Sequence, residues 1–359
     1  MRPDITVAVV AGREDTGRED VLDVLRCRES VIEGLTSRGV RAWPVDITRE
    51  DLLDENRVAR KILGTSPSCV FNLFEGFSDA SWLEIRFAGI LEKMSIPYTG
   101  NRSGTLALCL DKDLARKKLL QAGLPVAKGV CVSPGYDDSF VRELEFPLFV
   151  KPRMEDSSVG IDARSFVENP EDLFRLLDER LASFPDGLIV EEFLEGREYN
   201  AGFAGYHPYE LMAVSSIDYR FPEGAPAFLG YDSKWEPESS DYKNTASVAE
   251  ESLDPSTRKG IIKISRMAGK VMGCSGYFRV DLREHRGRIY ILEVNPNPDI
   301  NTDSGFAKQV ARKGYGYGEM VERLARLAVN GRAPYGKRQV REGERVPSHG
   351  GKDGCLLPT

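Results

Sequence analysis

Apolar residues in the first part of the chain form short continuous runs that alternate with segments of helical spacing. Such runs, rich in β-branched residues, are typical of buried strands, and apolar positions three and four apart are typical of helices. The strands expected here are residues 5–11, 40–45 and 69–74, and the helices are residues 19–38 and 82–94. Their alternation predicts a parallel α/β domain over residues 1–104. Ligands bind beyond the carboxyl ends of such strands, so loops 12–19 and 75–81 are expected to border a pocket.

Similar patterns continue along the rest of the chain, with one long interruption. Strands are expected at residues 126–132, 146–151, 188–194, 276–281 and 289–294, and helices at residues 111–122, 170–184, 255–272 and 318–329. Residues 220–246 are polar, rich in Pro, Gly, Ser and Asp, and contain aromatic side chains, which favours an ordered lid over a linker. Apolar periodicity is lost near the end, and residues 331–359 are expected to be a disordered tail.

The last two of these strands are separated by a polar turn and predict a β-hairpin that carries several charges. Because side chains alternate along a strand, Arg279 and Asp281 share one face, as do Glu293 and Asn295. A turn centred near Gly287 places Asp281 opposite Glu293, and like charges in that position destabilise a strand pair. A cation must therefore offset them, and oxygen ligands of this kind suit Mg²⁺. The alternative is a solvated outer face with an Arg–Asp ion pair.

Two further stretches are candidates for binding a phosphorylated ligand. Lys151 ends an apolar strand and is followed by a loop that contains Ser157, Ser158 and Gly160. Backbone amides, hydroxyl groups and one cation arranged in this way can hold phosphate, although a polar turn between antiparallel strands has the same composition. The strand at 188–194 can hold an adenine through its main chain, a role that needs no particular side chain.

Composition narrows the function classes. The 359 residues suffice for two or three domains, and 41% hydrophobic with 29% charged residues is an ordinary globular balance. A formal charge of −7 argues against nucleic acid or an anionic membrane as the main partner. Because no apolar run reaches the length of a membrane span and no signal segment begins the sequence, a cytoplasmic location is expected.

The cysteine and histidine content excludes two other classes of site. The six cysteines form no C-x-x-C pair and most fall among apolar residues, so we interpret them as buried thiols and not as disulfides or zinc ligands. None of the three histidines lies near a cysteine or carboxylate cluster with ligand spacing. A zinc enzyme or a Ser–His hydrolase is therefore not expected.

Taken together, the motifs resemble those of the ATP-grasp ligases and, within them, the D-alanine–D-alanine ligases. The resemblance covers roughly residues 5–329. The motifs that carry it are Ile96-Pro97-Tyr98-Thr99-Gly100, Leu110-Asp111-Lys112, Val150-Lys151-Pro152, Ser157-Ser158-Val159-Gly160, Glu191-Glu192-Phe193-Leu194, Gly196-Arg197-Glu198, Tyr231-Asp232-Ser233-Lys234, Arg279-Val280-Asp281, Glu293-Val294-Asn295 and Ser304. It implies an N-terminal α/β domain at 1–104, followed by two α+β ATP-grasp subdomains at 105–187 and 188–330.

The resemblance also implies roles for individual residues. Three lysines would neutralise the triphosphate, a serine-glycine loop would close over it, and a strand end followed by a glutamate would hold the adenine and the ribose. The lysines are Lys112, Lys151 and Lys234, and the loop residues are Ser157, Ser158 and Gly160. The adenine would lie at Glu191, Glu192, Phe193 and Leu194, and the ribose at Glu198. Asp281, Glu293 and Asn295 would hold two Mg²⁺ ions, for which Mn²⁺ can substitute. Arg279 would stabilise the acyl phosphate, and Ser304 would hold the carboxylate of the second amino acid.

The implied reaction is the formation of a peptide or amide bond. A carboxylate attacks the γ-phosphate of ATP to give an acyl phosphate, and an amine then displaces the phosphate. Because a carboxylate must approach a polyanion, the site needs dense positive charge, with Arg279, Lys234 and Ser157 as the implied catalytic residues. The expected product is D-alanyl-D-alanine for peptidoglycan, or another dipeptide or amide unrelated to the cell wall. A homodimer is expected by analogy, and an inactive ATP-binding sensor or scaffold is the alternative function.

Departures from the resembled pattern are concentrated where the amino acids should bind. The family's Ser-Ala-Glu turn, whose glutamate takes the first ammonium group, is replaced by a segment in which Glu14 and Glu19 are both candidates. Acidic residues that merely favour a helix N-terminus are the alternative there. The family's Pro-Gly becomes Pro298-Asp299, which adds a charge, and the tyrosine after the lid lysine becomes Trp235. We therefore expect intact ATP machinery with altered substrate recognition.

Overall fold

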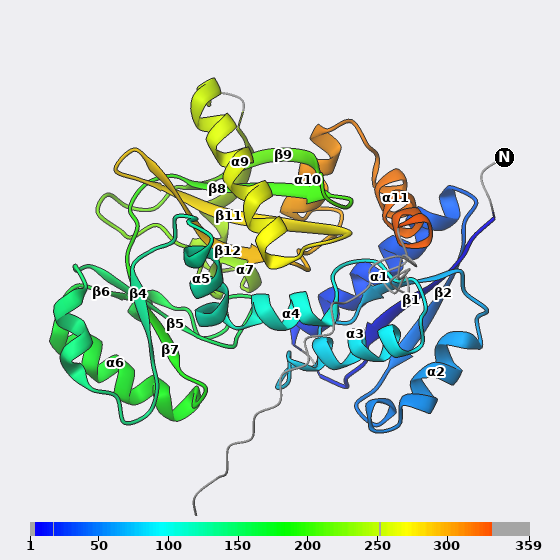
Figure 1. The fold of residues 1–359 in the computed structure, drawn as a ribbon, viewed down its shortest axis with the longest axis horizontal. Helices are drawn as coiled ribbons and strands as arrows, with labels where there is room; N and C mark the ends of the chain where they lie inside the picture. The colour runs from blue at the N-terminus through cyan, green and yellow to red at the C-terminus, as the bar shows by residue number, and fades with distance from the viewer. Residues whose placement is uncertain (1–3, 17, 251–252, 332–359) are drawn as a thin grey trace, which may run out of the picture.

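Residues 4–16, 18–250 and 253–331 are described in a computed structural model of the protein. They form three lobes, each built on its own β-sheet, with the first sheet at one end of the molecule and the other two at the opposite end (Figure 1). The tail expected at residues 331–359 lies outside the described residues, apart from Gly331. Within the described ranges no helix has the length and apolar content needed to span a membrane.

The N-terminal lobe contains the predicted parallel sheet, with strand order β2-β1-β3. Helices pack on both faces of the central strand β1, which explains its continuous apolar sequence. The edge strand β2 carries Pro44, a residue tolerated only where ladder hydrogen bonds are dispensable. The elements are β1 (Thr6–Gly12), β2 (Arg41–Ile47), β3 (Cys69–Leu73), α1 (Glu19–Ser37), α2 (Glu55–Leu63) and α3 (Leu83–Lys93).

The central lobe is an antiparallel sheet of order β4-β7-β5-β6 with α6 packed on one face. Helix α6 starts as its sequence predicts, because Asn169 accepts a hydrogen bond from the Asp172 amide and Pro170 occupies the first turn. Helices α4 and α5 connect this lobe to the N-terminal one (Figure 1). The elements are α4 (Ser103–Leu110), α5 (Lys112–Gln121), β4 (Gly129–Val132), β5 (Leu148–Pro152), β6 (Phe166–Val167), α6 (Pro170–Ser183) and β7 (Leu188–Glu192).

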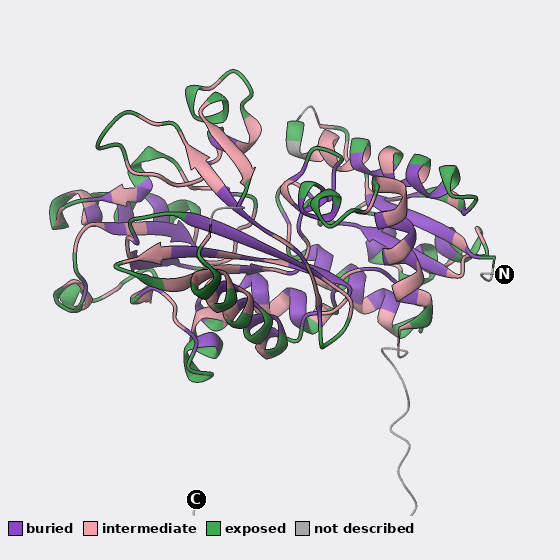
Figure 2. Ribbon diagram, turned by 90° about the horizontal axis from the view of Figure 1, so that it is seen from above, coloured by how far each residue is buried: buried purple, intermediate pink, exposed green. Residues whose placement is uncertain are grey.

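The third lobe is an antiparallel sheet of order β10-β9-β8-β11-β12, with α9 packed on one face. Its central strands are buried over most of their length (Figure 2). The segment between β9 and β10, residues 220–244, contains two short helices and is called the lid below. The elements are β8 (Glu198–Ala204), β9 (Glu210–Tyr219), α7 (Asp232–Trp235), α8 (Ser240–Lys243), β10 (Thr245–Ala249), α9 (Pro255–Met272), β11 (Tyr277–His285) and β12 (Arg288–Asn295).

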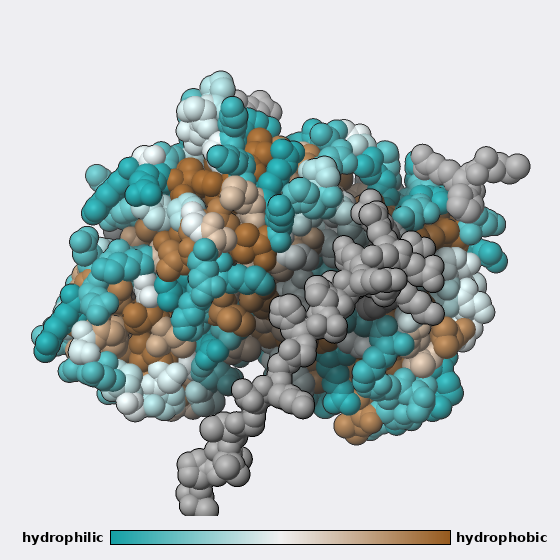
Figure 3. Space-filling model, in the orientation of Figure 1, coloured by the Kyte–Doolittle hydropathy of each residue, from teal (hydrophilic) through white to brown (hydrophobic). Residues whose placement is uncertain are grey.

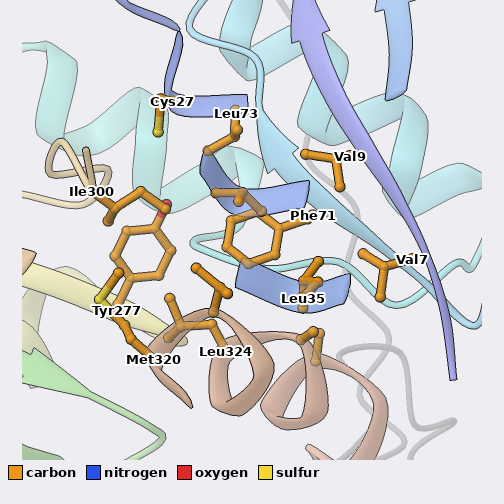
Figure 4. Packing of buried hydrophobic residues seen from close by; sticks show 14 of the residues in the cluster. Val7, Val9, Cys27, Leu35, Phe71, Leu73, Tyr277, Ile300, Met320 and Leu324 are labelled. Carbon is orange, nitrogen blue, oxygen red and sulfur yellow. The ribbon is translucent and has the colours of Figure 1, made fainter. Parts of the chain in front are cut away.

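The last two helices, α10 (Gly305–Arg312) and α11 (Tyr317–Asn330), return the chain to the N-terminal lobe. Met320 and Leu324 of α11 pack around Phe71 of β3, together with α1 (Figure 4). Tyr277, the first residue of β11, reaches into the same cluster. One hydrophobic core therefore includes residues on both sides of position 104, the expected domain boundary.

Several elements differ from those expected. Helices α2, α4 and α10, each of only eight or nine residues, and strands β6, β8, β9 and β10 had not been expected. The strand expected at 126–132 begins only at Gly129, since Val126 forms an isolated bridge with Ile291 of β12 and so connects two lobes. The segment expected to be an ordered lid contains the two short helices α7 and α8.

The described cysteines agree with their interpretation as thiols. Cys27, Cys69, Cys109 and Cys274 are buried and free, and Cys131 is free and half-buried. The sixth cysteine lies outside the described residues. On the face drawn in Figure 3, apolar residues lie in separate patches among polar ones.

Two glycines of α9 provide a matched test of the packing between this helix and β11. A Cβ at Gly269 would lie 2.4 Å from the ring of Phe278, which is fully buried, whereas a Cβ at Gly260 would meet no atom within 4 Å. Gly269→Ala should lower the free energy of unfolding by about 1–3 kcal/mol through overpacking. Gly260→Ala should raise it by roughly 0.5–1 kcal/mol through helix propensity. Chemical denaturation measures both, and equal stability of the two variants would contradict this packing.

Candidate active site

Strands β11 and β12 form the predicted hairpin, and its register brings the charged side chains together. Asp281 lies opposite Glu293, as a turn centred near Gly287 predicts, and Arg279 lies opposite Asn295. The Arg279 guanidinium donates to both carboxylate oxygens of Asp281, at 2.6 and 2.8 Å. Asn200 of the neighbouring strand β8 also donates to Asp281, at 2.8 Å. The Arg–Asp ion pair is thus present, but it is enclosed and not a solvated surface pair, with side chains 18% and 13% exposed.

Lysines from other segments face the same acids. The Nζ atom of Lys112, at the start of α5, lies 3.3 Å from Oε1 of Glu293. Burial alone would raise the pKa of Glu293, but three ammonium groups hold it below its ordinary value; they belong to Lys112, Lys151 and Lys234. Loss of solvent and the positive charge of Arg279 lower the pKa of Lys234. Cations and carboxylates from separate segments therefore converge, which is the arrangement that a polyanion with a metal ion needs.

A hollow lies between α5, β5, β7 and β12, next to these acids, and is lined by Lys112, Lys151, Glu191 and Glu293 together with apolar side chains. The Lys151 ammonium donates to Glu191 at 2.6 Å, and both side chains are nearly buried. An ammonium group has three N–H donors, so Lys151 keeps donors for a ligand after this contact. The strand pair β5–β7 therefore places one cation, already oriented, at the wall of the hollow.

The predicted phosphate loop follows β5 and has an unusual backbone. Ser157 and Ser158 have φ values of +54° and +63°, and Gly160 has φ +73°. Left-handed residues in a turn can direct successive amide groups toward an anion, at a cost in strain for residues other than glycine. The lid holds this loop, because Trp235 Nε1 donates to the Ser157 carbonyl at 3.0 Å and the Ser158 hydroxyl donates to the Leu229 carbonyl at 3.1 Å.

The segment expected to hold an adenine, residues 191–194, begins with the last two residues of β7, and some of its backbone amides are already hydrogen-bonded. The amide groups of Glu192 and Phe193 donate to carbonyl oxygens of neighbouring segments at 2.8 and 2.9 Å. These two amides are therefore not free to donate to an adenine. The main-chain groups that remain for it are the Leu194 amide and the carbonyl oxygens. Glu198, expected at the ribose, begins β8 and is only 5% exposed.

The two candidate glutamates at the N-terminal lobe lie in different environments. Glu14 accepts hydrogen bonds from the Ser78 amide at 2.7 Å and from its hydroxyl at 3.3 Å, which ties together the two loops expected to border a pocket. Glu19 begins α1, is exposed and pairs with Arg26 at 3.1 Å. Glu19 therefore fits the helix-terminus alternative, whereas the Glu14 carboxylate lies between two loops and is 3.5 Å from the Arg49 guanidinium.

The segment after β12 carries the other substrate candidates. Ser304 caps α10 with its hydroxyl oxygen and is 8% exposed. Asn301 bridges two acids: its amide donates to Asp299 at 2.8 Å, and its side chain donates to Asp23 of α1. Asp299 is accessible to solvent, but surrounding protein, followed by the charges of Asp23 and Asp303, raises its pKa to about 6. The charge that departs from the resembled pattern thus lies in an acidic environment.

Sequence reasoning missed several side chains at this site. Asp156, inside the phosphate loop, acts electrostatically on both Lys112 and Lys234, but nothing in its spacing distinguished it from a turn residue. Asn200 lies opposite Asp281 in the β8–β11 register, so a correct prediction of β8 would have revealed it. The Asp23–Asn301 contact joins segments far apart in the chain and leaves no local signal.

The chain is similar in sequence to known D-alanine–D-alanine ligases. A family model described as the D-ala D-ala ligase C-terminus matches residues 121–326. A D-alanine–D-alanine ligase of Desulforudis audaxviator is 30% identical over 85% of this chain and 93% of that protein. One of Haemophilus ducreyi is 33% identical over 90% of this chain and 98% of that protein.

Solved structures have the same fold. The crystal structure of a D-alanine–D-alanine ligase from Bacillus anthracis complexed with ATP has a TM-score of 0.72 at 20% identity, and covers 91% of this chain and 98% of that one. The VanG D-Ala:D-Ser ligase from Enterococcus faecalis has a TM-score of 0.71 at 23% identity, and covers 91% and 100%. The ATP-grasp fold expected from the sequence is confirmed, and the chain belongs to the D-alanine–D-alanine ligase family.

Proposed function

We propose that this protein uses ATP to join the carboxylate of one amino acid to the amine of another through an acyl phosphate. The observation that carries the proposal is the convergence of Lys112, Lys234 and Arg279 on the opposed acids Asp281 and Glu293. A carboxylate can attack a triphosphate only where this much positive charge offsets the repulsion between them. The names of the relatives favour two D-amino acids as substrates.

The triphosphate would lie between the phosphate loop and the hairpin. Lys112, Lys151 and Lys234 would neutralise it, and the amides of Ser157 and Ser158 with the Ser157 hydroxyl would hold its terminal oxygens. The lid contacts already described keep the loop in place and would exclude water from the reacting acyl phosphate. Adenine would lie against residues 191–194, and Glu198 would accept the ribose hydroxyls.

The donor set on the hairpin fits Mg²⁺. Asp281, Glu293 and Asn295 offer only oxygen atoms and lie on one face of two paired strands. In the part of the chain that the structure describes, no three His, Cys, Asp or Glu side chains form a metal cluster, so phosphate oxygens would have to complete the coordination. When bound, the metal ions would neutralise charge that develops on the phosphates.

The proposed substrate contacts come from the N-terminal lobe and from the segment after β12. Glu14 is the proposed partner of the first ammonium group, and Ser304 is the proposed partner of the second carboxylate. Arg279, held in place by Asp281, would stabilise the acyl phosphate while the amine attacks. Asp299 would influence which amine is accepted, because it adds a negative charge near Arg279. A cytoplasmic location and a homodimer belong to the same proposal.

The direct test is ADP release with pairs of amino acids, followed by mass spectrometry of the product. Wild-type protein should release ADP only when both a carboxylate and an amine are present. Asp281→Asn should lower kcat by about 100-fold or more, because it removes a charge that orients Arg279 and serves the metal, and should weaken ATP binding far less. Asp218→Asn, an exposed acid on the same sheet, is the control. No stimulation by any pair would refute the proposal in favour of an ATP-binding protein without turnover.

Metal removal provides a separate test of the hairpin donors. A chelator should abolish ADP release, and either Mg²⁺ or Mn²⁺ should restore it, because both accept oxygen ligands. The increase in Tm caused by ATP should also shrink without metal. Full activity in excess chelator would contradict the assignment of Asp281, Glu293 and Asn295 as ligands.

Asp299 gives a test that depends on pH. Its pKa of about 6 means that its carboxylate loses charge as the pH falls from 7 to 5. The KM for the amine should therefore rise over this window in wild-type protein, since the attraction for an ammonium group is lost. In Asp299→Asn the KM should be higher at pH 7 and nearly independent of pH, with the KM for ATP unchanged. The control Asp241→Asn, on exposed α8, should behave as wild type. A wild-type pH profile in Asp299→Asn would show that Asp299 does not recognise the amine.

A further inference from the structure

Glu198 receives two hydrogen bonds on one of its carboxylate oxygens. The Tyr219 hydroxyl donates to Oε2 at 2.8 Å, and a terminal nitrogen of the Arg283 guanidinium donates to the same atom. The three residues come from neighbouring strands, with Glu198 at the start of β8, Tyr219 at the end of β9 and Arg283 in β11. The other oxygen, Oε1, has no donor among the residues that the structure describes, so it can accept from a ligand.

Arg283 also contacts the segment that precedes β8. Its other terminal nitrogen donates to the Leu194 carbonyl at 3.2 Å, and its guanidinium carbon lies 5.5 Å from the centre of the Phe193 ring. Only 3% of Arg283 is exposed. One enclosed side chain therefore links residues 193–194, which belong to the proposed adenine contact, to the carboxylate proposed at the ribose.

The charges of this group are consistent with a fixed geometry. Burial opposes the charge of Arg283, but Glu198 and Tyr219 keep the Arg283 pKa above its ordinary value. Burial and the Glu198 carboxylate raise the pKa of Tyr219 well above its ordinary value, so its hydroxyl stays a donor. A buried Arg–Glu pair by itself is weak evidence for a role in stability, because desolvation offsets much of its attraction.

We propose that Arg283 and Tyr219 are positioning residues for the nucleotide: they hold Glu198 by one oxygen so that the other is directed at the ribose hydroxyls, and thereby select ATP over its 2′-deoxy form. This inference rests on the proposed function, in which Glu198 contacts the ribose. A hydrogen bond between a hydroxyl and an ionised group is strong, so its loss should be measurable as discrimination between the two nucleotides. Neither Arg283 nor Tyr219 touches the reacting atoms in this arrangement.

The test compares ATP with 2′-deoxy-ATP in ADP release. Wild-type protein should prefer ATP by about tenfold or more in kcat/KM. Tyr219→Phe and Arg283→Lys should reduce this preference at least fivefold by raising the KM for ATP, with kcat within about twofold and the KM for 2′-deoxy-ATP nearly unchanged. Arg323→Lys and Tyr315→Phe are matched controls, because Arg323 and Tyr315 donate to another glutamate, Glu210, at 2.8 and 3.1 Å.

The outcomes separate positioning from structural support. Equal losses with both nucleotides, or no loss with either, would overturn the proposal, as would a wild-type protein that uses both nucleotides equally well. Tyr219→Phe leaves the ion pair intact, so it carries the test if Arg283→Lys proves unstable. If no amino acids support turnover, the proposed function fails, and direct titration of both nucleotides by calorimetry still decides whether Tyr219→Phe loses selectivity for ribose.

Discussion

Two carboxylates fixed opposite each other on paired strands repel, and the surrounding charges are arranged to offset that repulsion. The register of β11 and β12 leaves Asp281 and Glu293 no freedom to separate. One acid is neutralised from within its own strand by Arg279, and the other from α5 by Lys112. The lobes are thus held to one another by electrostatics as well as by apolar contact, and the same cations are then in place for a polyanionic ligand.

Other enclosed acids are also paired with a cation from a neighbouring strand. Lys151 and Glu191 pair across β5 and β7, and Arg283 and Glu198 pair across β11 and β8. In each case an enclosed acid keeps capacity for one more contact, because its partner occupies only part of it. A site built from partly satisfied ion pairs is already oriented before any ligand arrives. That reduces the reorganisation needed when charge develops during the reaction.

Alternation along each strand was enough to predict which hairpin side chains share a face, because that depends only on local geometry. The pairing of Asp281 with Glu293 was predicted from the position of the turn, and in the structure it depends on a register shift between Asp281 and Leu282. The parallel N-terminal sheet followed from continuous apolar runs. Strand β8 was missed although Tyr199, Ala201 and Phe203 recur with a period of two and pack in the core, because Asn and Gly between them are residues that strands disfavour. The hydrogen-bond partners of Glu198 depend on the order of strands in the sheet, and the Asp23–Asn301 hydrogen bond depends on contact between lobes. Neither can be predicted from local sequence.

The return of α11 to the first sheet has a consequence for synthesis on the ribosome. Strands β1 to β3 are complete once residue 73 has emerged, yet Met320 and Leu324 are still to be made. Until then, apolar residues of β3 such as Phe71 lack some of their packing partners and stay partly exposed to solvent. The core between the first sheet and α11 is therefore completed only after nearly the whole chain has been made.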